Sequence, residues 1–280
     1  MMSVYYVNGA FVDKDDALLP VTDLAILRGY GVFDYLRTYN GQPVSLDANV
    51  ARLRQSARLI GLGYPWSDGE IAAIVNETIQ RNGYDESSIR IVVTGGSSPD
   101  NITPNGEPSL IVMVEEMQPY PDWWYNRGVK IVTANIARLY PGAKSINYIP
   151  AILARQQADA DAVEVIYSTE TGHVLEGTTS NLFLVKDGTL ITPHLERVLP
   201  GITRRTVIDA VKVEFAIKER DISLDELYGA DEVFITAANK RVVPVITVDD
   251  RTISSGQPGP VTQRVMQLFD AVTYGVAKQV

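Results

Sequence analysis

The sequence predicts a protein of two α+β domains, and three observations support this prediction. The chain has 280 residues, which is long for one small hydrophobic core and short for three. Hydrophobic residues make up 45% and charged residues 21%, which is ordinary for a folded protein and excludes a disordered or fibrous chain. Strand-like and helix-like segments are mixed without a regular strand–helix–strand order, and this mixture is typical of α+β folds.

The first third of the chain is expected to form strands, hairpins and two helices. Asn-Gly pairs at 8–9 and 40–41 favour hairpin turns, because both central positions of such a turn need a positive φ. Four segments have strand-like patterns: Tyr5–Val7, Val32–Tyr39, Ile89–Thr94 and Leu110–Glu115. Apolar residues recur every three or four positions in two predicted helices, one from Leu46 to a stop at Gly61 and one over Asp68–Arg81.

Prolines and aromatic residues gather over 118–128 and predict a domain boundary there. We expect a small α+β domain over 1–117, an interdomain linker over 118–128 and a large α+β domain over 129–280. The expected strands of the large domain are Val129–Thr133, Val163–Tyr167, Asn181–Val185, Leu190–Thr192, Val233–Thr236 and Val242–Val248. Its expected helices are Ile149–Ala160, Ile202–Val213 and a last helix from Val261.

Charge and composition exclude several classes of function. Lys and Arg number 25 against 34 Asp and Glu, and the net charge of −9 argues against binding to a nucleic acid backbone. There is no cysteine and there are two histidines, so we expect no disulfide, no cysteine nucleophile and no metal site. The sequence starts without a leader pattern, and no segment reaches the roughly 18 apolar residues of a membrane helix. We therefore expect a cytoplasmic protein without membrane contact.

The chemistry must then come from lysine, carboxylates, hydroxyls or an external cofactor. The sequence contains no motif for a phosphate-binding loop, a dinucleotide-binding fold, the nucleophile elbow of a hydrolase or a zinc protease. His173 follows a Thr-Gly turn and His194 follows a proline, so both are interpreted as surface residues. A hydrolase that uses one of these histidines is the rival interpretation from another class.

Three separated segments are similar to one family when they are taken in order. They are residues 144–148 (KSINY), 176–183 (EGTTSNLF) and 199–204 (LPGITR). Together they resemble the fold-type IV pyridoxal-phosphate enzymes, and the resemblance continues at 28–33 (RGYGVF), 50–53 (VARL) and 230–234 (ADEVF). This family includes branched-chain aminotransferases, D-amino-acid aminotransferases, (R)-amine transaminases and aminodeoxychorismate lyases. The resemblance implies a two-domain fold-type IV structure whose large domain binds pyridoxal 5'-phosphate.

The resemblance assigns roles around the cofactor ring. Such an enzyme needs one lysine whose amine forms a Schiff base with the cofactor and then moves the α-proton of the substrate, and Lys144 matches that residue. Glu176 matches the carboxylate beside the ring nitrogen, where a negative charge favours the protonated form. Outside the family context, Lys144 is an ordinary loop lysine and Glu176 an ordinary strand-end glutamate. A non-catalytic relative of the same fold is a further alternative, and the presence of both residues argues against it.

The resemblance also assigns residues to the cofactor phosphate. Arg52 matches the family's phosphate-binding arginine, and its alternative role is that of an exposed helix arginine. Gly201, Ile202 and Thr203 open a helix whose N–H groups and dipole favour an anion. The family usually has two hydroxyls in the turn after the strand near residue 233, whereas this chain has Thr236 and then Ala238. We therefore expect Thr236 and the Ala238 position to line the phosphate site, with Thr236 or Asn239 as a partial substitute for the missing hydroxyl and a weaker hold on the cofactor.

The substrate carboxylate needs a different partner here than in the well-known bacterial D-amino-acid enzymes. Those enzymes use an Arg-x-His pair in the loop after Ile89–Thr94, where this chain has Asp100 and Ile102. Arg28, which stands where relatives usually have a tyrosine, and Arg90 are the candidate replacements.

Arg90 lies between two isoleucines in a predicted strand, so we expect it on the opposite sheet face, buried and in need of an anion. The alternatives are an ion pair at a dimer interface for Arg28 and a structural salt bridge for Arg90. Tyr30 and Phe33, from the segment 28–33, are further candidate substrate contacts.

The substrate class follows from small differences between sub-families. Lys-Ser-Ile-Asn at 144–147 resembles the Lys-Ser-Leu-Asn of D-amino-acid aminotransferases. Residues 32–37 (VFDYLR) depart from the Val-Phe-Glu-Gly of branched-chain enzymes. Tyr148, in contrast, is a feature that resembles the branched-chain enzymes. The prediction is a transaminase that takes amino groups from D-amino acids to 2-oxoglutarate or pyruvate. A branched-chain L-amino-acid aminotransferase, an (R)-amine transaminase and an aminodeoxychorismate lyase remain alternatives. The family also implies a homodimer, in which the loop Gly95–Pro108 reaches the neighbouring site.

Overall fold

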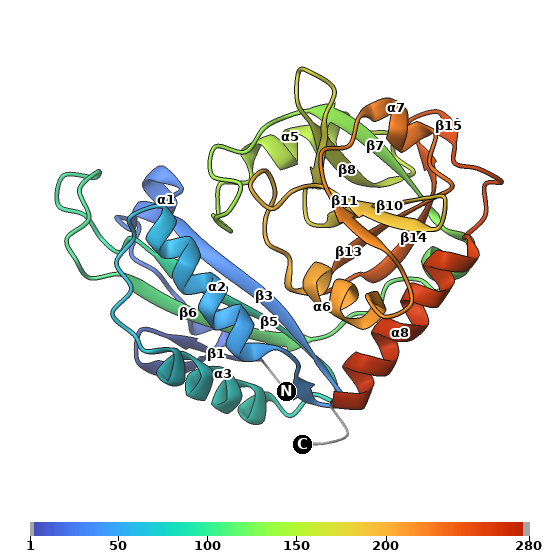
Figure 1. Cartoon of the computed structure of the whole chain (residues 1–280). Coiled ribbons are helices and arrows are strands. Elements are labelled where there is room, and N and C mark those ends of the chain that lie inside the picture. Colours follow the sequence, from blue (N-terminus) through green and yellow to red (C-terminus); the bar gives the residue numbers. More distant parts are fainter. Residues whose placement is uncertain (1–2, 277–280) are drawn as a thin grey trace. The chain divides into compact units, whose positions relative to one another are not determined.

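The computed structural model describes residues 3–276, and its contacts divide the chain into two units (Figure 1). The first unit contains residues 3–118 together with 143–147, and the second contains residues 119–142 and 148–275. Both units combine helices with a mostly antiparallel sheet, which confirms the predicted α+β class. Within the described residues, no helix has the length and apolar character that crossing a membrane requires.

The first unit is a six-stranded antiparallel sheet with the strand order β2-β1-β6-β5-β3-β4. Its strands are β1 (Val4–Val7), β2 (Ala10–Asp13), β3 (Gly31–Tyr39), β4 (Gln42–Pro43), β5 (Ser87–Thr94) and β6 (Ser109–Glu116). Its helices are the 3₁₀ turn η1 (Lys14–Asp16), α1 (Leu24–Arg28), α2 (Leu46–Leu59) and α3 (Asp68–Asn82). Both predicted Asn-Gly turns are present, and all four of their residues have positive φ.

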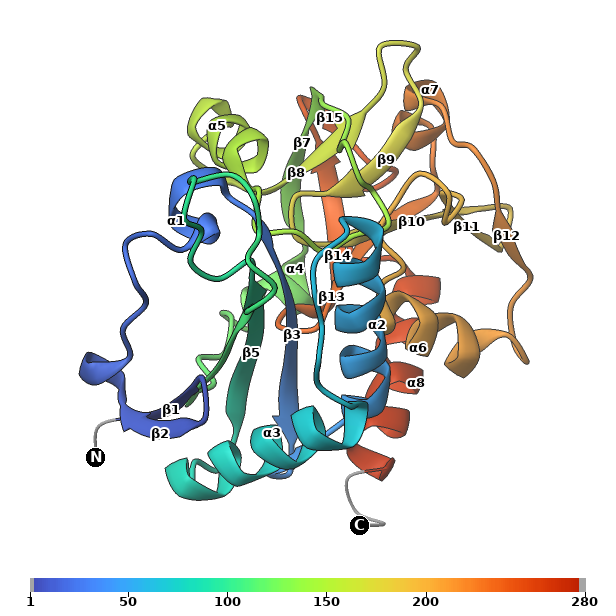
Figure 2. The ribbon, with the colours of Figure 1, turned by 90° about the vertical axis from the view of Figure 1, so that its left-hand side faces the viewer.

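Helices α2 and α3 cover one face of this sheet and enclose the core of the unit (Figure 1, Figure 2). Val50 and Leu53 of α2 and Ile71 of α3 are fully buried against Ile89 and Ile91 of β5. Because side chains alternate along a strand, the neighbours of these isoleucines point to the opposite face of the sheet.

The segment 143–147 pairs with the start of β3 in the first unit. Phe33 N donates to Lys144 O over 2.9 Å, and Ile146 N donates to Gly31 O over 3.1 Å. A Cβ at Gly31 would lie 2.9 Å from the backbone oxygen of Val93 and 2.9 Å from Ile146 Cδ1, so glycine suits this close approach. The backbone of Lys144 is therefore held by sheet-like hydrogen bonds.

The second unit contains a nine-stranded sheet and five helices. The strands are β7 (Val129–Asn135), β8 (Ala162–Ser168), β9 (Val174–Gly177), β10 (Asn181–Lys186), β11 (Thr189–Thr192), β12 (Ile217–Glu219), β13 (Glu232–Ala237), β14 (Arg241–Val248) and β15 (Arg251–Thr252). The helices are α4 (Trp123–Arg127), α5 (Ile149–Gln157), α6 (Ile202–Val211), α7 (Leu224–Tyr228) and α8 (Pro260–Val276). The strand order is β12-β11-β10-β13-β14-β7-β8-β9, with β15 beside β14.

Alternating side chains divide the interior of the second unit into two cores. Leu182 and Leu184 of β10 belong to one core, and Phe183 of β10 belongs to the other. Phe183 stacks on Phe234 with 4.9 Å between the ring centroids, and α6 and α8 pack over this pair. Two of the predicted site residues lie near the ends of strands of this sheet, Glu176 in β9 and Thr236 in β13.

Leu53→Ala is expected to lower the free energy of unfolding by about 3 kcal/mol, because Leu53 is fully buried in α2 and its loss leaves a cavity. Urea denaturation of the cofactor-free protein measures this change. Leu59→Ala on the same helix is the matched control. Its side chain is 44% exposed, so we expect a loss below about 1 kcal/mol. Equal losses in the two variants would show that α2 does not pack as described.

Candidate active site

Lys144 lies in the first unit beside the aromatic ring of Phe33. Its Nζ is 4.7 Å from the centroid of that ring. Its backbone N–H donates to Ser56 Oγ on α2 over 3.1 Å, in addition to the bond between its carbonyl and β3. The main chain thus fixes the position of Lys144, and the amine extends along the sheet face that Phe33 occupies.

Arg52 projects from α2 and forms a two-point ion pair with Asp34 of β3. Arg52 Nε donates to Asp34 Oδ2 and Arg52 Nη2 donates to Asp34 Oδ1, each over 2.8 Å. Asn49 Nδ2 also donates to Asp34 Oδ1 over 2.7 Å, and Asp34 is fully buried. This pairing fixes the plane of the guanidinium, and a guanidinium with a fixed plane is suited to orient a phosphate. Asp34 was not predicted as a site residue, although strand alternation places it on the helix-covered face.

Arg90 points away from Ile89 and Ile91, as strand alternation predicts. The expectation that Arg90 is buried is wrong, because its residue is exposed while the helices cover the other face of the sheet. Its guanidinium lies 4.9 Å from the ring centroid of Phe33 and 5.7 Å from that of Tyr35. Within residues 3–276 it takes part in no ion pair, so the alternative of a structural salt bridge has no support there.

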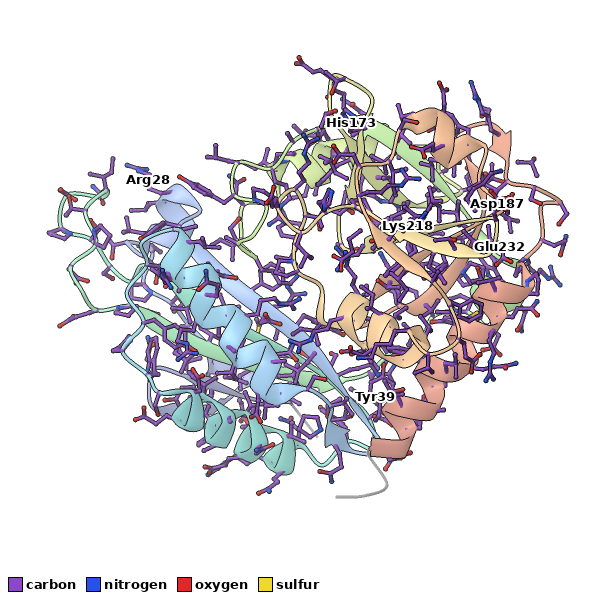
Figure 3. All side chains as sticks on the ribbon, viewed as in Figure 1. Arg28, Tyr39, His173, Asp187, Lys218 and Glu232 are labelled. Atoms are coloured by element: carbon purple, nitrogen blue, oxygen red, sulfur yellow. The ribbon has the colours of Figure 1, made fainter. Side chains whose placement is uncertain are left out.

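Tyr30 and Arg28 do not join this group of side chains. Tyr30 packs against the helix-covered core, and its hydroxyl donates to Ile60 O over 3.2 Å. Burial raises the pKa of the Tyr30 phenol. Arg28 ends α1 with an exposed side chain (Figure 3), and its Nη1 donates to Leu27 O over 2.7 Å. The first unit therefore brings together Lys144, Phe33 and Arg90, but neither Tyr30 nor Arg28.

Glu176 lies near the end of β9 in the second unit and is 4% exposed. Arg138 Nη1 donates to Glu176 Oε1 over 2.9 Å. The backbone N–H of Leu199 and Asn181 Nδ2 donate to Glu176 Oε2 over 2.9 Å and 3.3 Å. A carboxylate with this set of donors has a fixed orientation and can accept a further hydrogen bond from a protonated ring nitrogen. Neither Arg138 nor the role of Asn181 was identified from the sequence.

Gly201, Ile202 and Thr203 form the start of α6, as predicted. Gly201 is the N-cap, and no side chain caps the first N–H groups of the helix. A Cβ at Gly201 would lie 1.8 Å from Asn181 Oδ1, so only glycine fits beside the residue that also binds Glu176. The helix start and Glu176 are therefore adjacent through Asn181, and the free N–H groups suit an anion.

The hairpin between β13 and β14 contains Thr236 and Ala238. Thr236 Oγ1 is buried and has no hydrogen-bond partner within the described part of the chain. Ala238 lies in the turn that follows, where no hydroxyl replaces the missing one, and Asn239 Nδ2 donates to Tyr120 Oη over 2.8 Å. An unsatisfied buried hydroxyl is costly, and Thr236 Oγ1 can donate a hydrogen bond to a group that binds here.

Each unit thus offers contacts of the kind that pyridoxal phosphate needs. The first unit has an amine on Lys144 and a fixed guanidinium on Arg52. The second unit has a fixed carboxylate on Glu176, a helix start at Gly201 and an unsatisfied hydroxyl on Thr236. The groups of each unit, taken by itself, are of kinds that bind parts of a phosphorylated pyridine aldehyde.

Comparison with known proteins identifies the family. The family model for class IV amino-transferases matches residues 31–248. A Methanocaldococcus jannaschii protein, provisionally named a branched-chain-amino-acid aminotransferase, is 35% identical over 274 residues, which are 94% of each chain. The D-alanine aminotransferase of Bacillus licheniformis is 32% identical over 264 residues, which are 92% of this chain and 93% of the relative.

A solved structure supports the same assignment. A branched-chain amino acid aminotransferase from T.th., solved with pyridoxamine 5'-phosphate, matches with a TM-score of 0.92 and 31% identity, over 98% of this chain and 95% of that chain. The fold-type IV prediction is thus confirmed. The chain belongs to the class IV aminotransferase family and is a pyridoxal-phosphate-dependent aminotransferase.

Proposed function

We propose that this aminotransferase moves the amino group of a D-amino acid to a 2-oxo acid such as 2-oxoglutarate or pyruvate. In this proposal Lys144 is the amine to which the cofactor attaches, and it moves the proton at the substrate Cα. Glu176 holds the ring nitrogen, and Arg52 with the start of α6 binds the phosphate. When bound, pyridoxal phosphate supplies the electron sink that makes the Cα–H bond acidic.

The position of Arg90 is the observation that supports an amino acid as the donor. Arg90 and Lys144 both lie against the ring of Phe33, on the same face of the first unit's sheet. A substrate whose amine lies near Lys144 can therefore place a carboxylate on the guanidinium of Arg90. Phe33 is 7% exposed and gives the site an apolar wall.

The preference for D-amino acids rests on the sequence around the lysine. Residues 144–147 are similar to those of D-amino-acid enzymes, and the B. licheniformis relative is named a D-alanine aminotransferase. The second candidate is a branched-chain L-amino-acid aminotransferase, which is favoured by the name of the solved T.th. structure and by Tyr148.

We further propose that the protein is a cytoplasmic homodimer. Sedimentation equilibrium measures the mass of the assembly and so tests the dimer.

The experiment that separates these candidates is a set of parallel half-reactions. Enzyme loaded with cofactor is mixed with D-alanine, D-glutamate, L-leucine or (R)-phenylethylamine, and the loss of the cofactor's visible absorption is followed. We expect rapid loss with the two D-amino acids. A response to L-leucine alone would replace the proposal with the branched-chain candidate.

Arg90→Leu is expected to raise KM for D-alanine and D-glutamate by roughly 10- to 100-fold, because a charged hydrogen bond to the carboxylate is lost. (R)-Phenylethylamine has no carboxylate, so KM for this donor is expected to stay within about 3-fold of the value for the unchanged enzyme. Such a change corresponds to less than about 1 kcal/mol of binding free energy. Steady-state kinetics with both donors measure the two effects.

Arg81→Leu is the matched control, because Arg81 also lies over an aromatic ring in the first unit, 4.0 Å from the centroid of Phe11. Its kinetics with both donors are expected to match those of the unchanged enzyme. An equal loss on amino acids and on the carboxylate-free amine in Arg90→Leu would refute the assignment of Arg90.

A further inference from the structure

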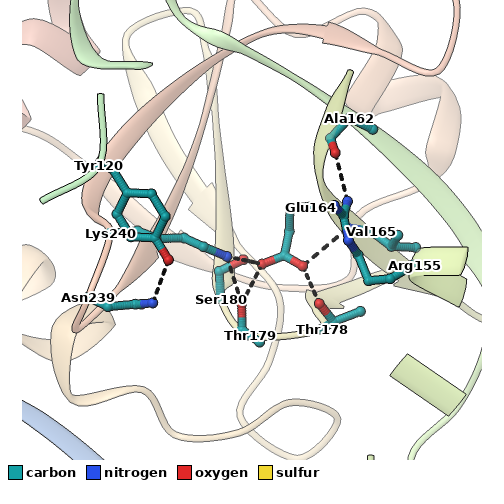
Figure 4. A network of polar contacts seen from close by, with 10 residues as sticks. All are labelled: Tyr120, Arg155, Ala162, Glu164, Val165, Thr178, Thr179, Ser180, Asn239 and Lys240. Carbon is teal, nitrogen blue, oxygen red and sulfur yellow. Dashed lines mark hydrogen bonds and ion pairs between the residues drawn. The ribbon is translucent and has the colours of Figure 1, made fainter. Parts of the chain in front are cut away.

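A buried ion pair lies in the second unit beside the turn that follows Glu176. Glu164 of β8 is 1% exposed and Lys240, before β14, is 5% exposed. Lys240 Nζ donates to Glu164 Oε2 over 2.6 Å (Figure 4). Two charges leave water at considerable cost, so such a pair persists only where further hydrogen bonds complete it.

Three hydroxyls of the turn 178–180 complete this pair. Thr178 Oγ1 donates to Glu164 Oε1, and Thr179 Oγ1 and Ser180 Oγ donate to Glu164 Oε2 over 2.8 Å and 3.0 Å. Lys240 Nζ also donates to Thr179 Oγ1 over 2.6 Å, which closes a ring of contacts (Figure 4). The carboxylate of Glu164 thus fixes every side chain of this turn.

The charges around Glu164 make Lys240 essential to the arrangement. Burial by itself would raise the pKa of Glu164. The effect of burial is outweighed by the charge and hydrogen bond of Lys240 and by the hydrogen bonds of the hydroxyls, which lower the pKa to about 2. The phenols of Tyr120 and Tyr167 lie near the carboxylate, and burial raises the pKa of both, that of Tyr167 to about 12. These phenols are neutral at physiological pH, so the positive charge that stabilises Glu164 comes from Lys240.

The turn 178–180 connects two residues of the candidate site. Glu176 and Gly177 end β9 before the turn, and Asn181 begins β10 after it. Asn181 Nδ2 donates to Glu176 Oε2, so the shape of the turn sets the position of both groups. A Cβ at Gly177 would lie 2.9 Å from Glu164 Cγ, so the backbone just before the turn lies directly on the Glu164 side chain.

We propose that Lys240 and Glu164 are positioning residues that hold the turn 178–180 and thereby place Glu176 against the cofactor ring nitrogen. This inference rests on the proposed role of Glu176, and it is independent of donor preference. The pair also connects this turn to the hairpin that contains Thr236 and Ala238, because Lys240 ends the turn of that hairpin. Ring binding and phosphate binding in the second unit are therefore mechanically coupled through one lysine.

The test compares Lys240→Met with the double variant Glu164→Gln/Lys240→Met. In Lys240→Met the buried carboxylate loses its counter-charge, so the turn shifts. We expect kcat to fall and the cofactor dissociation constant to rise, each by about 10-fold, as is usual when the group that orients a binding residue is lost. KM for the amino donor is expected to change by less than about 3-fold. The neutral double variant is expected to recover most of both losses, because no unpaired buried charge remains.

A spectroscopic measurement distinguishes positioning from a general loss of stability. The visible absorption of the bound cofactor is titrated against pH without any amino donor, and its midpoint depends on how Glu176 meets the ring nitrogen. We expect a shifted midpoint in Lys240→Met and a return towards the original value in the double variant. An unchanged midpoint in Lys240→Met would overturn the proposal, even if the variant unfolds more easily.

Two further variants make the result decisive. Thr179→Val removes the hydroxyl that joins Lys240 to Glu164 while the charges stay, so a smaller shift of the midpoint in the same direction is expected even if Lys240→Met does not fold. An unchanged midpoint in Thr179→Val would then refute the proposal. Lys186→Met is the matched control, because Lys186 pairs with Asp231 at the surface of the same unit over 3.1 Å, and no shift is expected.

Discussion

Lys144→Ala is expected to lower kcat by at least about 1,000-fold, because the variant has no amine to carry the cofactor or to move the α-proton. The fold is expected to survive. The hydrogen bonds of Lys144 to Phe33 of β3 and to Ser56 are made by its backbone, which alanine retains. Steady-state kinetics and circular dichroism measure the two effects.

Borohydride treatment followed by mass spectrometry gives a second readout for Lys144. The unchanged enzyme is expected to keep the cofactor covalently at residue 144, while Lys144→Ala gains no mass. Lys14→Ala is the matched control in the first unit, because Lys14 pairs with Glu115 over 2.7 Å at the surface. Cofactor attached to Lys144→Ala at another lysine, with activity retained, would show that Lys144 is not the attachment site.

Glu176→Gln is expected to lower kcat by roughly 100-fold, because a neutral amide no longer stabilises a protonated ring nitrogen during the reaction. Its carbonyl can still accept from Leu199 N and from Asn181, so the turn is expected to keep its shape. The amide N–H group would then face Arg138, which is also a donor. Kinetics and the pH titration of the bound cofactor's absorption measure the change.

The matched control is Glu226→Gln in the same unit. Glu226 also accepts from a guanidinium, that of Arg220 over 2.7 Å, and from a backbone N–H, that of Ser223 over 3.0 Å. It caps the short helix α7, so its loss is expected to affect stability and not kcat. A kcat of Glu176→Gln within about 3-fold of that of the unchanged enzyme would disprove the role of Glu176, since a 3-fold change corresponds to less than about 1 kcal/mol.

The long elements could be predicted from the sequence because their signals are local. The periodic apolar residues of α2 and α3 and the strand patterns of β3, β5 and β6 lie within single segments, and the structure has them within two residues of the expected bounds. The short elements α1, α4 and α7 were not predicted. Each has five residues, which is too short for a helical period to show.

The site was predictable where a motif has a fixed local structure and not where distant segments meet. Gly201 and the start of α6 follow from a short turn motif. Strand alternation gave the direction of Arg90, but its exposure depends on which sheet face the helices cover. The local sequence around Lys240 indicates a solvated turn residue, yet Lys240 is buried against Glu164 of β8. No local pattern can reveal a pair between such distant segments.

The pairing of the segment 143–147 with β3 has a consequence for synthesis on the ribosome. Until residues 143–147 leave the ribosome, the edge of β3 at Gly31 and Phe33 has N–H and C=O groups without their final partners. Exposed strand edges pair readily with other chains. Folding of the first unit therefore finishes only after the chain has begun the second, and this edge of β3 stays open to other chains until then.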